Sequence, residues 1–392
     1  MYYLWSCARA VYSIAMKKIP LSSPDITDKE RNAVQKVLHS PVLSIGPNAG
    51  KFEEALARYA GRKFGVAVNS GTAALHLIIR ALGIKEGDEV ITTPFSFIAS
   101  SNCVLFEGAK PVFVDIDPVT LCVDPARIEK AICPQTKAIL GVDVFGHPAQ
   151  WNAIARIAKK HSLKVIEDSA ESVGSFYKGK PCGSFGDAAI YSFYPNKQMT
   201  TGEGGLVLTD NKEIADLCRS MTNQGRKVEG GKWLEHIRLG YNYRLPEIQC
   251  ALGLAQFSRL PQLLAKRKKA AASYAKKLSD VSGVKIPFVS DDTTMSWFVY
   301  VIQLSEKFSR QNRDRVITLM EEQGIQCGIY FQCIHLQPFY REQFGFKEGD
   351  FPITESVSAR AIALPFFSNI TESQIDRVTR ALRNALMEIK HV

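Results

Sequence analysis

Apolar residues recur along this chain with two different periods. Short apolar runs predict buried strands, and stretches with an apolar residue every three or four positions predict amphipathic helices. The runs predict strands at 64–68, 89–92, 110–114, 138–142, 164–167, 188–192 and 205–208. The helical pattern between them predicts helices at 72–82, at 96–106, from 124 onward and at 149–161.

Strands that alternate with helices predict βαβ units, because parallel neighbours need a long crossover connection. The sequence therefore predicts an α/β fold built on a large, mostly parallel sheet. Two helices precede it: a capping box at Thr27–Glu30 opens one that runs to about His39, and Gly46-Pro47 opens another that runs to about Ala60. Little sequence separates the last two strands, so this part of the sheet is expected to include an antiparallel pair.

The pattern changes near Pro261. A long basic helix is predicted at 263–278, followed by fewer and more separated elements. These are a strand at 296–304, a helix at 312–323 and a last helix opened by a second capping box at 371–374. We therefore divide the chain into a large domain at 16–262 and a smaller C-terminal α/β domain at 263–392.

The first fifteen residues do not fit this organisation. The stretch Met1–Ala15 is apolar but is interrupted by Arg9, is too short to span a membrane and lacks the basic leading region of a secretory signal. Either it is a loose extension, or Met16 is the natural start. We favour the second and expect 1–15 to be dispensable.

Composition narrows the class of protein. The 392 residues carry 49 Lys and Arg against 39 Asp and Glu, and this net charge of +10 suits anions such as nucleotide phosphates or nucleic acid. The densest basic run, Lys266–Lys269 with Lys276 and Lys277, lies in Ala-rich helical sequence, which favours a solvated helix face. The nine cysteines form no CxxC pair, which argues against disulfides and metal and favours a reducing cytoplasm.

Ligands bind open α/β sheets at the carboxyl ends of the strands, so the residues after each strand are the candidates. The segment Asn69–Ala74 follows the first strand and opens a helix at Gly71-Thr72. The free N–H groups and the dipole of a helix N-terminus favour a phosphate, and a glycine permits its close approach. The alternative is an ordinary Ser/Thr N-cap.

An acid follows a later strand. Asp168 comes directly after 164–167, where a carboxylate can lie beneath a bound ring. Facing a pyridine nitrogen, it would shift the nitrogen's pKa by roughly 1–3 units toward the protonated form. A protonated pyridine is the electron sink that pyridoxal 5'-phosphate (PLP) chemistry requires. The alternatives are an N-cap and a surface acid.

Lys197 lies on the loop after strand 188–192, ahead of the glycine-rich turn Gly202–Gly205. That place suits a Schiff base with PLP, although most lysines are surface residues. Ser192, at the end of the same strand, could donate to a phosphate. Phe97, after another strand, could stack on a flat ring, and core packing is its alternative.

Together these features carry a family resemblance. The chain resembles the sugar aminotransferases of the DegT/DnrJ/StrS type, which belong to the aspartate-aminotransferase fold class of PLP enzymes. The resemblance extends from about Ile19 to the last helix and is most specific between Glu167 and Gly205. The matching segments are NSGTAALHL, GDEVITTPFSFIASSN, GAKPVFVDID, VIEDSAESVGSFYKGKPCGSFGDAAIYSFYPNKQMTTGEGGLV, GYNYRLPEIQCALGLAQ and HLQPFY.

The resemblance implies a role for each candidate. Lys197 would form the Schiff base and carry the proton, and Asp168 would pair with the ring nitrogen. Phe97 would stack on the ring, and the phosphate would be held by Gly71, Thr72 and Ser192.

It also implies roles for three further residues. Glu171 would lie near the ring hydroxyl, where relatives often have Gln or His, and an anionic Glu there would need a proton or another partner. Asn242, in GYNYR, would reach the phosphate in the neighbouring subunit's site. His335, in HLQPFY, would line the sugar pocket.

The implied activity is transfer of an amino group, from L-glutamate, to a keto carbon of a nucleotide-linked sugar. The implied protein is a cytoplasmic homodimer with shared active sites in amino sugar or polysaccharide biosynthesis, without nucleic-acid or membrane partners. Two alternatives remain: a PLP-dependent sugar dehydratase and a basic regulatory protein on the same scaffold. Some dehydratase relatives carry histidine in place of the lysine, so Lys197 favours transamination.

Overall fold

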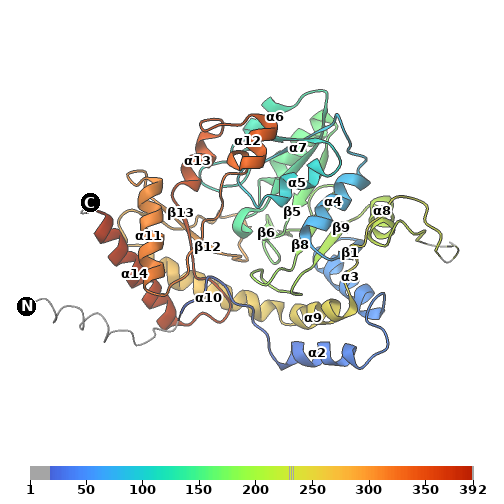
Figure 1. Cartoon of the computed structure of the whole chain (residues 1–392), viewed down its shortest axis with the longest axis horizontal. Coiled ribbons are helices and arrows are strands. Elements are labelled where there is room, and N and C mark those ends of the chain that lie inside the picture. Colours follow the sequence, from blue (N-terminus) through green and yellow to red (C-terminus); the bar gives the residue numbers. More distant parts are fainter. Residues whose placement is uncertain (1–17, 229, 231, 233, 391–392) are drawn as a thin grey trace, which may run out of the picture.

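The computed structural model describes residues 18–228, 230, 232 and 234–390 (Figure 1). The predicted extension at 1–15 lies outside these residues. Within them, no helix combines the length and the apolar character needed to cross a membrane.

The main sheet has seven strands in the order β1-β9-β8-β5-β4-β2-β3. Six strands run in one direction and β9 alone runs the other way, so the predicted antiparallel pair is confirmed as β8 and β9. The strands are β1 (Phe64–Val68), β2 (Glu89–Thr92), β3 (Lys110–Phe113), β4 (Thr136–Val142), β5 (Lys164–Asp168), β8 (Ala188–Ser192) and β9 (Gly205–Thr209).

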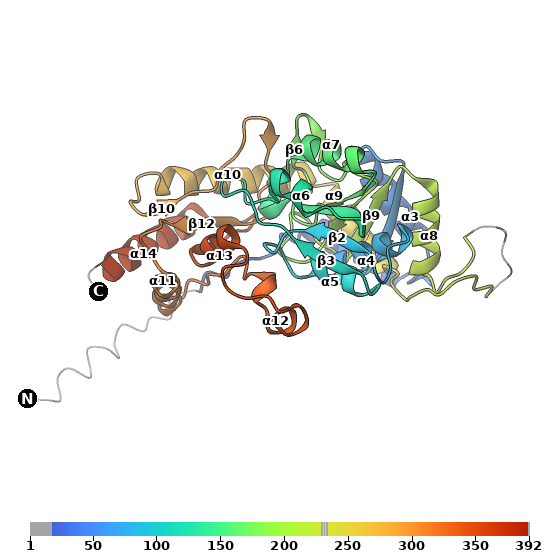
Figure 2. The ribbon, with the colours of Figure 1, turned by 90° about the horizontal axis from the view of Figure 1, so that it is seen from above.

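Helices cover this sheet on two sides (Figure 2). Apolar side chains of β1, β8 and β9 alternate between a face that packs on α4 and α8 and a face that packs on α3 and α9. The helices of the large domain are α2 (Asp28–Leu38), α3 (Pro47–Tyr59), α4 (Gly71–Ala81), α5 (Ala99–Leu105), α6 (Pro125–Ala131), α7 (Trp151–His161), α8 (Lys212–Thr222) and α9 (Glu247–Phe257).

Local signals explain where two of these helices begin. The predicted capping box of α2 is present: the Thr27 hydroxyl accepts the backbone N–H of Glu30, and the Glu30 carboxylate accepts the backbone N–H of Thr27. The prediction that a helix begins at Ser96 is wrong, because α5 begins at Ala99. Thr93 Oγ1 accepts the N–H of Phe95 in a turn that delays the helix.

The C-terminal part has its own three-stranded sheet, in the order β10-β12-β13. Ile19, from the start of the described chain, pairs with Ile325 and belongs to the core of this part. Its elements are α10 (Leu260–Leu278), β10 (Val284–Lys285), β12 (Tyr300–Leu304), α11 (Arg310–Glu322), α12 (Pro338–Phe344), α13 (Pro352–Ser358), β13 (Ala361–Leu364) and α14 (Glu372–Lys390).

The strand predicted at 296–304 is shorter than expected, since β12 begins at Tyr300. Trp297 has a left-handed backbone with a φ of 58°, and the N–H of Ser296 donates to Ser175 Oγ. This backbone turn and this hydrogen bond direct the chain toward the large domain before β12 begins. The short strand β11 (Thr293–Thr294) likewise pairs with β6 (Phe176–Tyr177), which also pairs with β7 (Lys180–Pro181).

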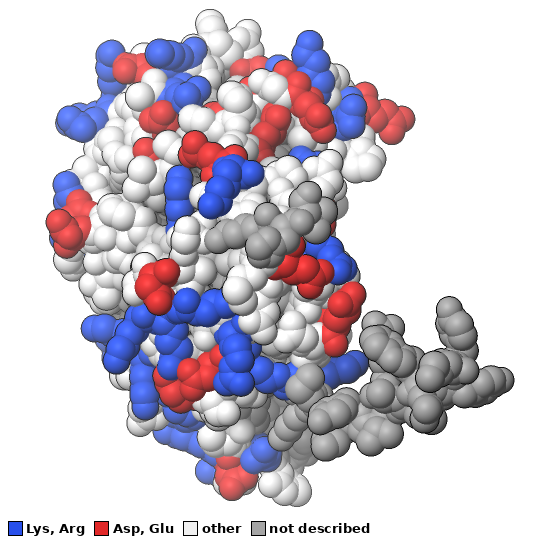
Figure 3. All heavy atoms as spheres, turned by 90° about the vertical axis from the view of Figure 1, so that its left-hand side faces the viewer, with Lys and Arg blue, Asp and Glu red and all other residues white. Residues whose placement is uncertain are grey.

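The basic run on α10 is partly engaged within the chain. Lys266 pairs with Asp25, Lys277 pairs with Glu372 and Asp376, and Arg267 is buried. Figure 3 shows the side of the molecule that lies on the left in Figure 1, where Lys and Arg are interspersed with Asp and Glu. The ion pairs on α10 support a solvated helix face rather than a continuous basic stripe.

Candidate active site

A cavity of about 500 Å³ lies at the carboxyl ends of β5 and β8, beside the N-terminus of α4. Aromatic residues from the C-terminal part, Phe298, Tyr330 and Phe331, complete its wall. Seven of the nine residues predicted from the sequence line it: Gly71, Thr72, Phe97, Asp168, Glu171, Ser192 and Lys197.

The start of α4 has the shape and the free N–H groups of a cradle that would suit an anion. Ser70 is the N-cap of this helix, and its hydroxyl accepts the N–H of Ala73 at 3.1 Å. The first N–H groups of a helix have no carbonyl within it to bond, so those at Gly71 and Thr72 suit a phosphate. A Cβ on Gly71 would lie 3.0 Å from Ser192 Cβ and 3.1 Å from its Oγ. The close approach of these two residues therefore favours glycine at position 71, because a Cβ there would push Ser192 away by a few tenths of an ångström.

We predict that Gly71→Ala raises the dissociation constant of PLP by about five- to a hundredfold without unfolding the protein. The added methyl would displace Ser192, and overpacking costs about 1–3 kcal/mol. Isothermal titration of the apo protein measures the effect. Gly50→Ala is the matched control, because Gly50 lies in α3 with no other atom within 4 Å of its added Cβ. Unchanged PLP affinity in Gly71→Ala would contradict the cradle.

Asp168 ends β5 and is only 4% exposed. Ser100 Oγ donates to one carboxylate oxygen at 2.7 Å, and the N–H of Ala170 donates to the other at 3.1 Å. Burial raises the pKa of Asp168, while these two donors and the charge of Lys197 act in the opposite direction. A cation facing Asp168 would stabilise the carboxylate further, and the protonated nitrogen of a pyridine ring is such a cation.

Lys197 projects into the cavity from the loop after β8. Its Nζ lies 3.5 Å from Glu171 Oε1 and 3.9 Å from the centre of the Phe298 ring. The second oxygen of Glu171 accepts the N–H of Phe145 at 2.8 Å. Burial raises the pKa of Glu171, and Lys197 opposes that shift. The partner that an anionic Glu171 was expected to need is therefore Lys197 together with this backbone N–H.

Phe97 does not pack into the core. Its side chain is 61% exposed and lies on the wall of the cavity. An aromatic face that is open toward a cavity can stack on a flat ring. The core-packing alternative for Phe97 is therefore wrong.

Two predicted residues lie elsewhere. Asn242 is exposed and does not line the cavity of its own chain, and its carbonyl accepts the side-chain amide of Asn69 at 3.3 Å. His335 is fully buried: its Nε2 lies 3.0 Å from Glu355 Oε1 and its ring centre lies 4.7 Å from that of Phe351. The structure does not bring His335 to the cavity, because this pairing and packing hold it inside the C-terminal part.

The cavity also contains residues that the sequence did not single out. Ser100 supports Asp168, and the Ser96 and Ser100 hydroxyls lie 2.8 Å apart. Asn196 donates to the Tyr330 hydroxyl at 3.3 Å and so joins the lysine loop to the C-terminal part. The sequence did contain a signal for Ser100. Ser100 lies in the segment after a strand end, as Phe97 does, and it is four residues after Ser96, which is one helical turn. No local signal marks Tyr330.

One group of potential metal ligands occurs among the described residues. Ligand atoms of Asp143, Glu167 and Cys182 all lie within 4.8 Å of one another, and all three residues are buried. The Asp143 carboxylate accepts hydrogen bonds from one backbone N–H, one indole N–H and one serine hydroxyl. The Glu167 carboxylate accepts hydrogen bonds from two backbone N–H groups. Burial raises the pKa of Asp143 to about 6 and that of Glu167 well above its usual range. These contacts account for the group as a structural cluster.

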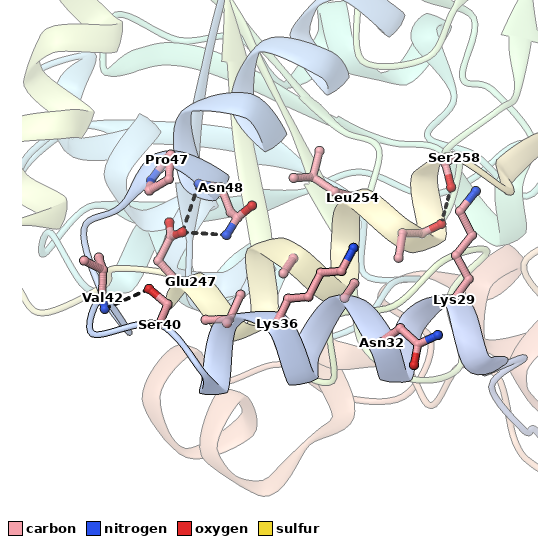
Figure 4. A pocket seen from close by; sticks show the side chains of 14 residues that line it. Lys29, Asn32, Lys36, Ser40, Val42, Pro47, Asn48, Glu247, Leu254 and Ser258 are labelled. Atoms are coloured by element: carbon pink, nitrogen blue, oxygen red, sulfur yellow. Dashed lines mark hydrogen bonds between the residues drawn. The ribbon is translucent and has the colours of Figure 1, made fainter.

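A second hollow, of about 620 Å³, lies between α2, α3 and α9, away from this chemistry (Figure 4). In this hollow the Glu247 carboxylate accepts hydrogen bonds from the backbone N–H groups of Asn48 and Ala49 and from the side-chain amide of Asn48. Glu247 thus satisfies the free N–H groups at the start of α3. This role is structural.

A mostly parallel α/β sheet with a lysine, a buried aspartate and a helix N-terminus at its strand ends is typical of PLP-dependent enzymes of the aspartate-aminotransferase fold class. The sequence profile of the DegT/DnrJ/EryC1/StrS aminotransferase family matches residues 24–383, and the chain belongs to this family. The resemblance inferred from the sequence is confirmed.

Similar proteins agree with this assignment. The chain is 39% identical to the spore coat polysaccharide biosynthesis protein SpsC of Bacillus subtilis (strain 168), over 93% of this chain and 96% of that protein. It is 30% identical to Helicobacter pylori PseC, an aminotransferase involved in the biosynthesis of pseudoaminic acid, with a TM-score of 0.89 over 95% of this chain and 100% of that one. The PLP form of the putative sugar aminotransferase Spr1654 from Streptococcus pneumoniae gives a TM-score of 0.90 at 27% identity, over 95% of this chain and 99% of that one. The protein is therefore a PLP-dependent sugar aminotransferase.

Proposed function

We propose that this enzyme moves an amino group from L-glutamate to a keto carbon of a nucleotide-linked sugar, with PLP attached to Lys197. The observation that carries the proposal is the presence of Lys197, Asp168 and the Gly71–Ser192 cradle in one cavity. SpsC, named for polysaccharide biosynthesis, and PseC, an aminotransferase of pseudoaminic acid biosynthesis, support a sugar acceptor.

The residues present fit the cofactor. PLP, when bound, supplies an electron sink for the negative charge that develops at the reacting carbon. Asp168 would hold the ring nitrogen and Phe97 would stack on the ring. Gly71, Thr72 and Ser192 would bind the phosphate, since they lie together at the start of α4.

Lys197 would also carry the proton. Once its amine is free, Nζ can take a proton from the substrate carbon and deliver it to the cofactor carbon, as a general base and then a general acid. Glu171, 3.5 Å from Nζ, keeps the amine directed into the cavity. The Phe298 ring, 3.9 Å from Nζ, covers it on another side and keeps water from that position.

A half-reaction screen tests the proposal. The pyridoxamine 5'-phosphate form of the enzyme is mixed with a panel of nucleotide-linked keto sugars while the absorbance of the oxidised cofactor is followed. A keto sugar that restores this absorbance and gains an amino group supports the proposal, and formation of 2-oxoglutarate from L-glutamate identifies the donor. A sugar that loses a hydroxyl without forming 2-oxoglutarate would instead support the dehydratase alternative.

We also propose a symmetric homodimer in which Asn242 serves the neighbouring subunit's site. Asn242 is exposed and lies outside its own cavity. Apolar side chains on the adjoining segment are exposed as well: Val228, Leu234, Ile237 and Leu239. An exposed apolar surface of this kind is typical of a protein interface, and a second copy would cover it.

Complementation between two inactive variants tests the shared site. Lys197→Ala and Asn242→Trp subunits are each expected to be inactive as homodimers. If Asn242 serves the neighbour, a mixed dimer contains one intact site, and random pairing restores roughly a quarter of wild-type activity. If Asn242 serves its own chain, every site carries a lesion and mixing after subunit exchange recovers nothing. The second outcome would reject the shared site.

We further propose that the enzyme works in the reducing cytoplasm. All eight cysteines among the described residues are free thiols, and six of them are buried: Cys103, Cys122, Cys182, Cys218, Cys250 and Cys333. Such usage is typical of proteins from reducing compartments.

A further inference from the structure

Arg267 is a buried arginine whose hydrogen bonds within the described part of the chain go only to backbone carbonyls. It lies on α10 and is 2% exposed. Its Nη1 donates to the carbonyls of Trp297 at 3.2 Å and Phe298 at 3.0 Å, and its Nη2 donates to those of Asn196 at 3.2 Å and Lys197 at 2.8 Å. No carboxylate among the described residues forms an ion pair with it.

Such a placement is costly for the fold. A buried charge without a counter-charge loses its hydration, and an apolar side chain of similar volume would avoid that loss. Burial lowers the pKa of Arg267 to about 10, so the side chain remains cationic at neutral pH. The ring of Phe366, 5.7 Å from the guanidinium carbon, and the four carbonyls offset the cost only in part. Arg267 therefore adds little to stability, and what it contributes instead is a fixed geometry between the groups that it bonds.

The four carbonyls belong to two segments that meet at the active site. Asn196 and Lys197 lie on the loop after β8, and Trp297 and Phe298 lie just before β12 in the C-terminal part. The same two segments bring Lys197 Nζ to 3.9 Å from the centre of the Phe298 ring. A guanidinium is planar and holds its N–H groups in a fixed fork, so it sets the distance between both segments.

We propose that Arg267 is a positioning residue: it holds the Lys197 loop against the Phe298 segment, so that the lysine amine points at the place where PLP and substrate react. This inference rests on the proposed role of Lys197. Without Arg267 the two backbones would be free to separate, and Nζ would lose its fixed place between Phe298 and Glu171. Small displacements of a reacting group can reduce rates up to about a hundredfold.

The test compares variants of two buried arginines. Arg267→Met removes the guanidinium, and Arg267→Lys keeps the charge but not the fork. Arg313→Met is the matched control, because Arg313 is 4% exposed and its Nη1 donates to the carbonyls of Ser358 and Ala361, which do not line the cavity. The rate of covalent PLP attachment to the apo protein is followed by absorbance, alongside the melting temperature and kcat.

We expect both Arg267 variants to attach PLP at least about tenfold more slowly than the wild type, with a matching fall in kcat. Arg313→Met should lower the melting temperature but attach PLP within about twofold of the wild-type rate. Arg267→Lys serves as the decisive variant if Arg267→Met does not fold. Wild-type attachment rates in a folded Arg267 variant, or an equal slowing in Arg313→Met, would overturn the inference.

Lys197→Ala in the same assay separates this inference from the function on which it rests. If the wild type attaches PLP and Lys197→Ala does not, the role of Lys197 stands, and the Arg267 variants then decide the inference alone. If Lys197→Ala attaches PLP as the wild type does, the proposed role of Lys197 fails, and the inference fails with it.

Discussion

Replacing Lys197 with alanine is expected to abolish turnover and the absorption band of covalently attached cofactor. The change removes both the amine that bonds PLP and the group that carries the proton. General acid–base catalysis alone contributes about 10²–10⁴-fold, so kcat should fall by at least about 10⁴-fold. No second lysine among the described residues lines the cavity, so none is placed to substitute for it. Absorbance spectra and steady-state rates measure the two effects.

The fold should survive this change. Lys197→Ala leaves Glu171 without its cationic partner, but Glu171 can take up a proton because burial already raises its pKa. Lys160→Ala is the surface control: Lys160 pairs with Glu129 in an exposed ion pair and should leave spectrum and rate unchanged. Addition of a small free amine should restore part of the activity of Lys197→Ala. Wild-type turnover in that variant would refute the assignment of Lys197.

The positions of the strands and the residues that follow them could be predicted because the signals are local, whereas the order of the strands in the sheet was not predicted. Alternating apolar runs identify the strands, and parallel strands bring their carboxyl ends to one edge, which places Gly71, Asp168 and Lys197 together. The helices α8 and α9 were not predicted. For α8 a signal was present, since the Asn211 side chain caps its first turn by accepting two backbone N–H groups. For α9 no side chain makes a cap hydrogen bond.

The part of the site that comes from the C-terminal domain could not be predicted locally. Phe298 and Tyr330 reach the cavity through packing between segments far apart in sequence, which no short pattern encodes. Arg267 looked like one more residue of a basic run. Yet it shares a helical face with Leu263, Ala270 and Tyr274, all buried, so the 3.6-residue period did indicate that it points inward. The charge of its neighbours obscured that signal.

Asp168→Asn is expected to keep bound cofactor but lose activity about a hundredfold. Lys197 and the Gly71–Ser192 cradle remain in place, so binding should persist. An amide cannot hold the ring nitrogen in its charged form. Two unit charges about 4 Å apart interact by roughly 4 kcal/mol at an effective dielectric of about 20. Losing about two-thirds of that interaction raises the barrier enough for the expected hundredfold loss, at about 1.36 kcal/mol per tenfold.

Two further measurements distinguish this role of Asp168 from a structural one. Burial raises the pKa of Asp168, so a neutral asparagine should leave the melting temperature of the apo protein unchanged or higher. Ser100→Ala removes one donor at 2.7 Å but keeps the carboxylate, so its activity should fall only about tenfold. An Asp168→Asn protein with wild-type kcat would show that Asp168 does not hold the ring nitrogen. One that unfolds without cofactor would show instead that the fold requires the carboxylate, because the activity loss would then follow from the loss of structure.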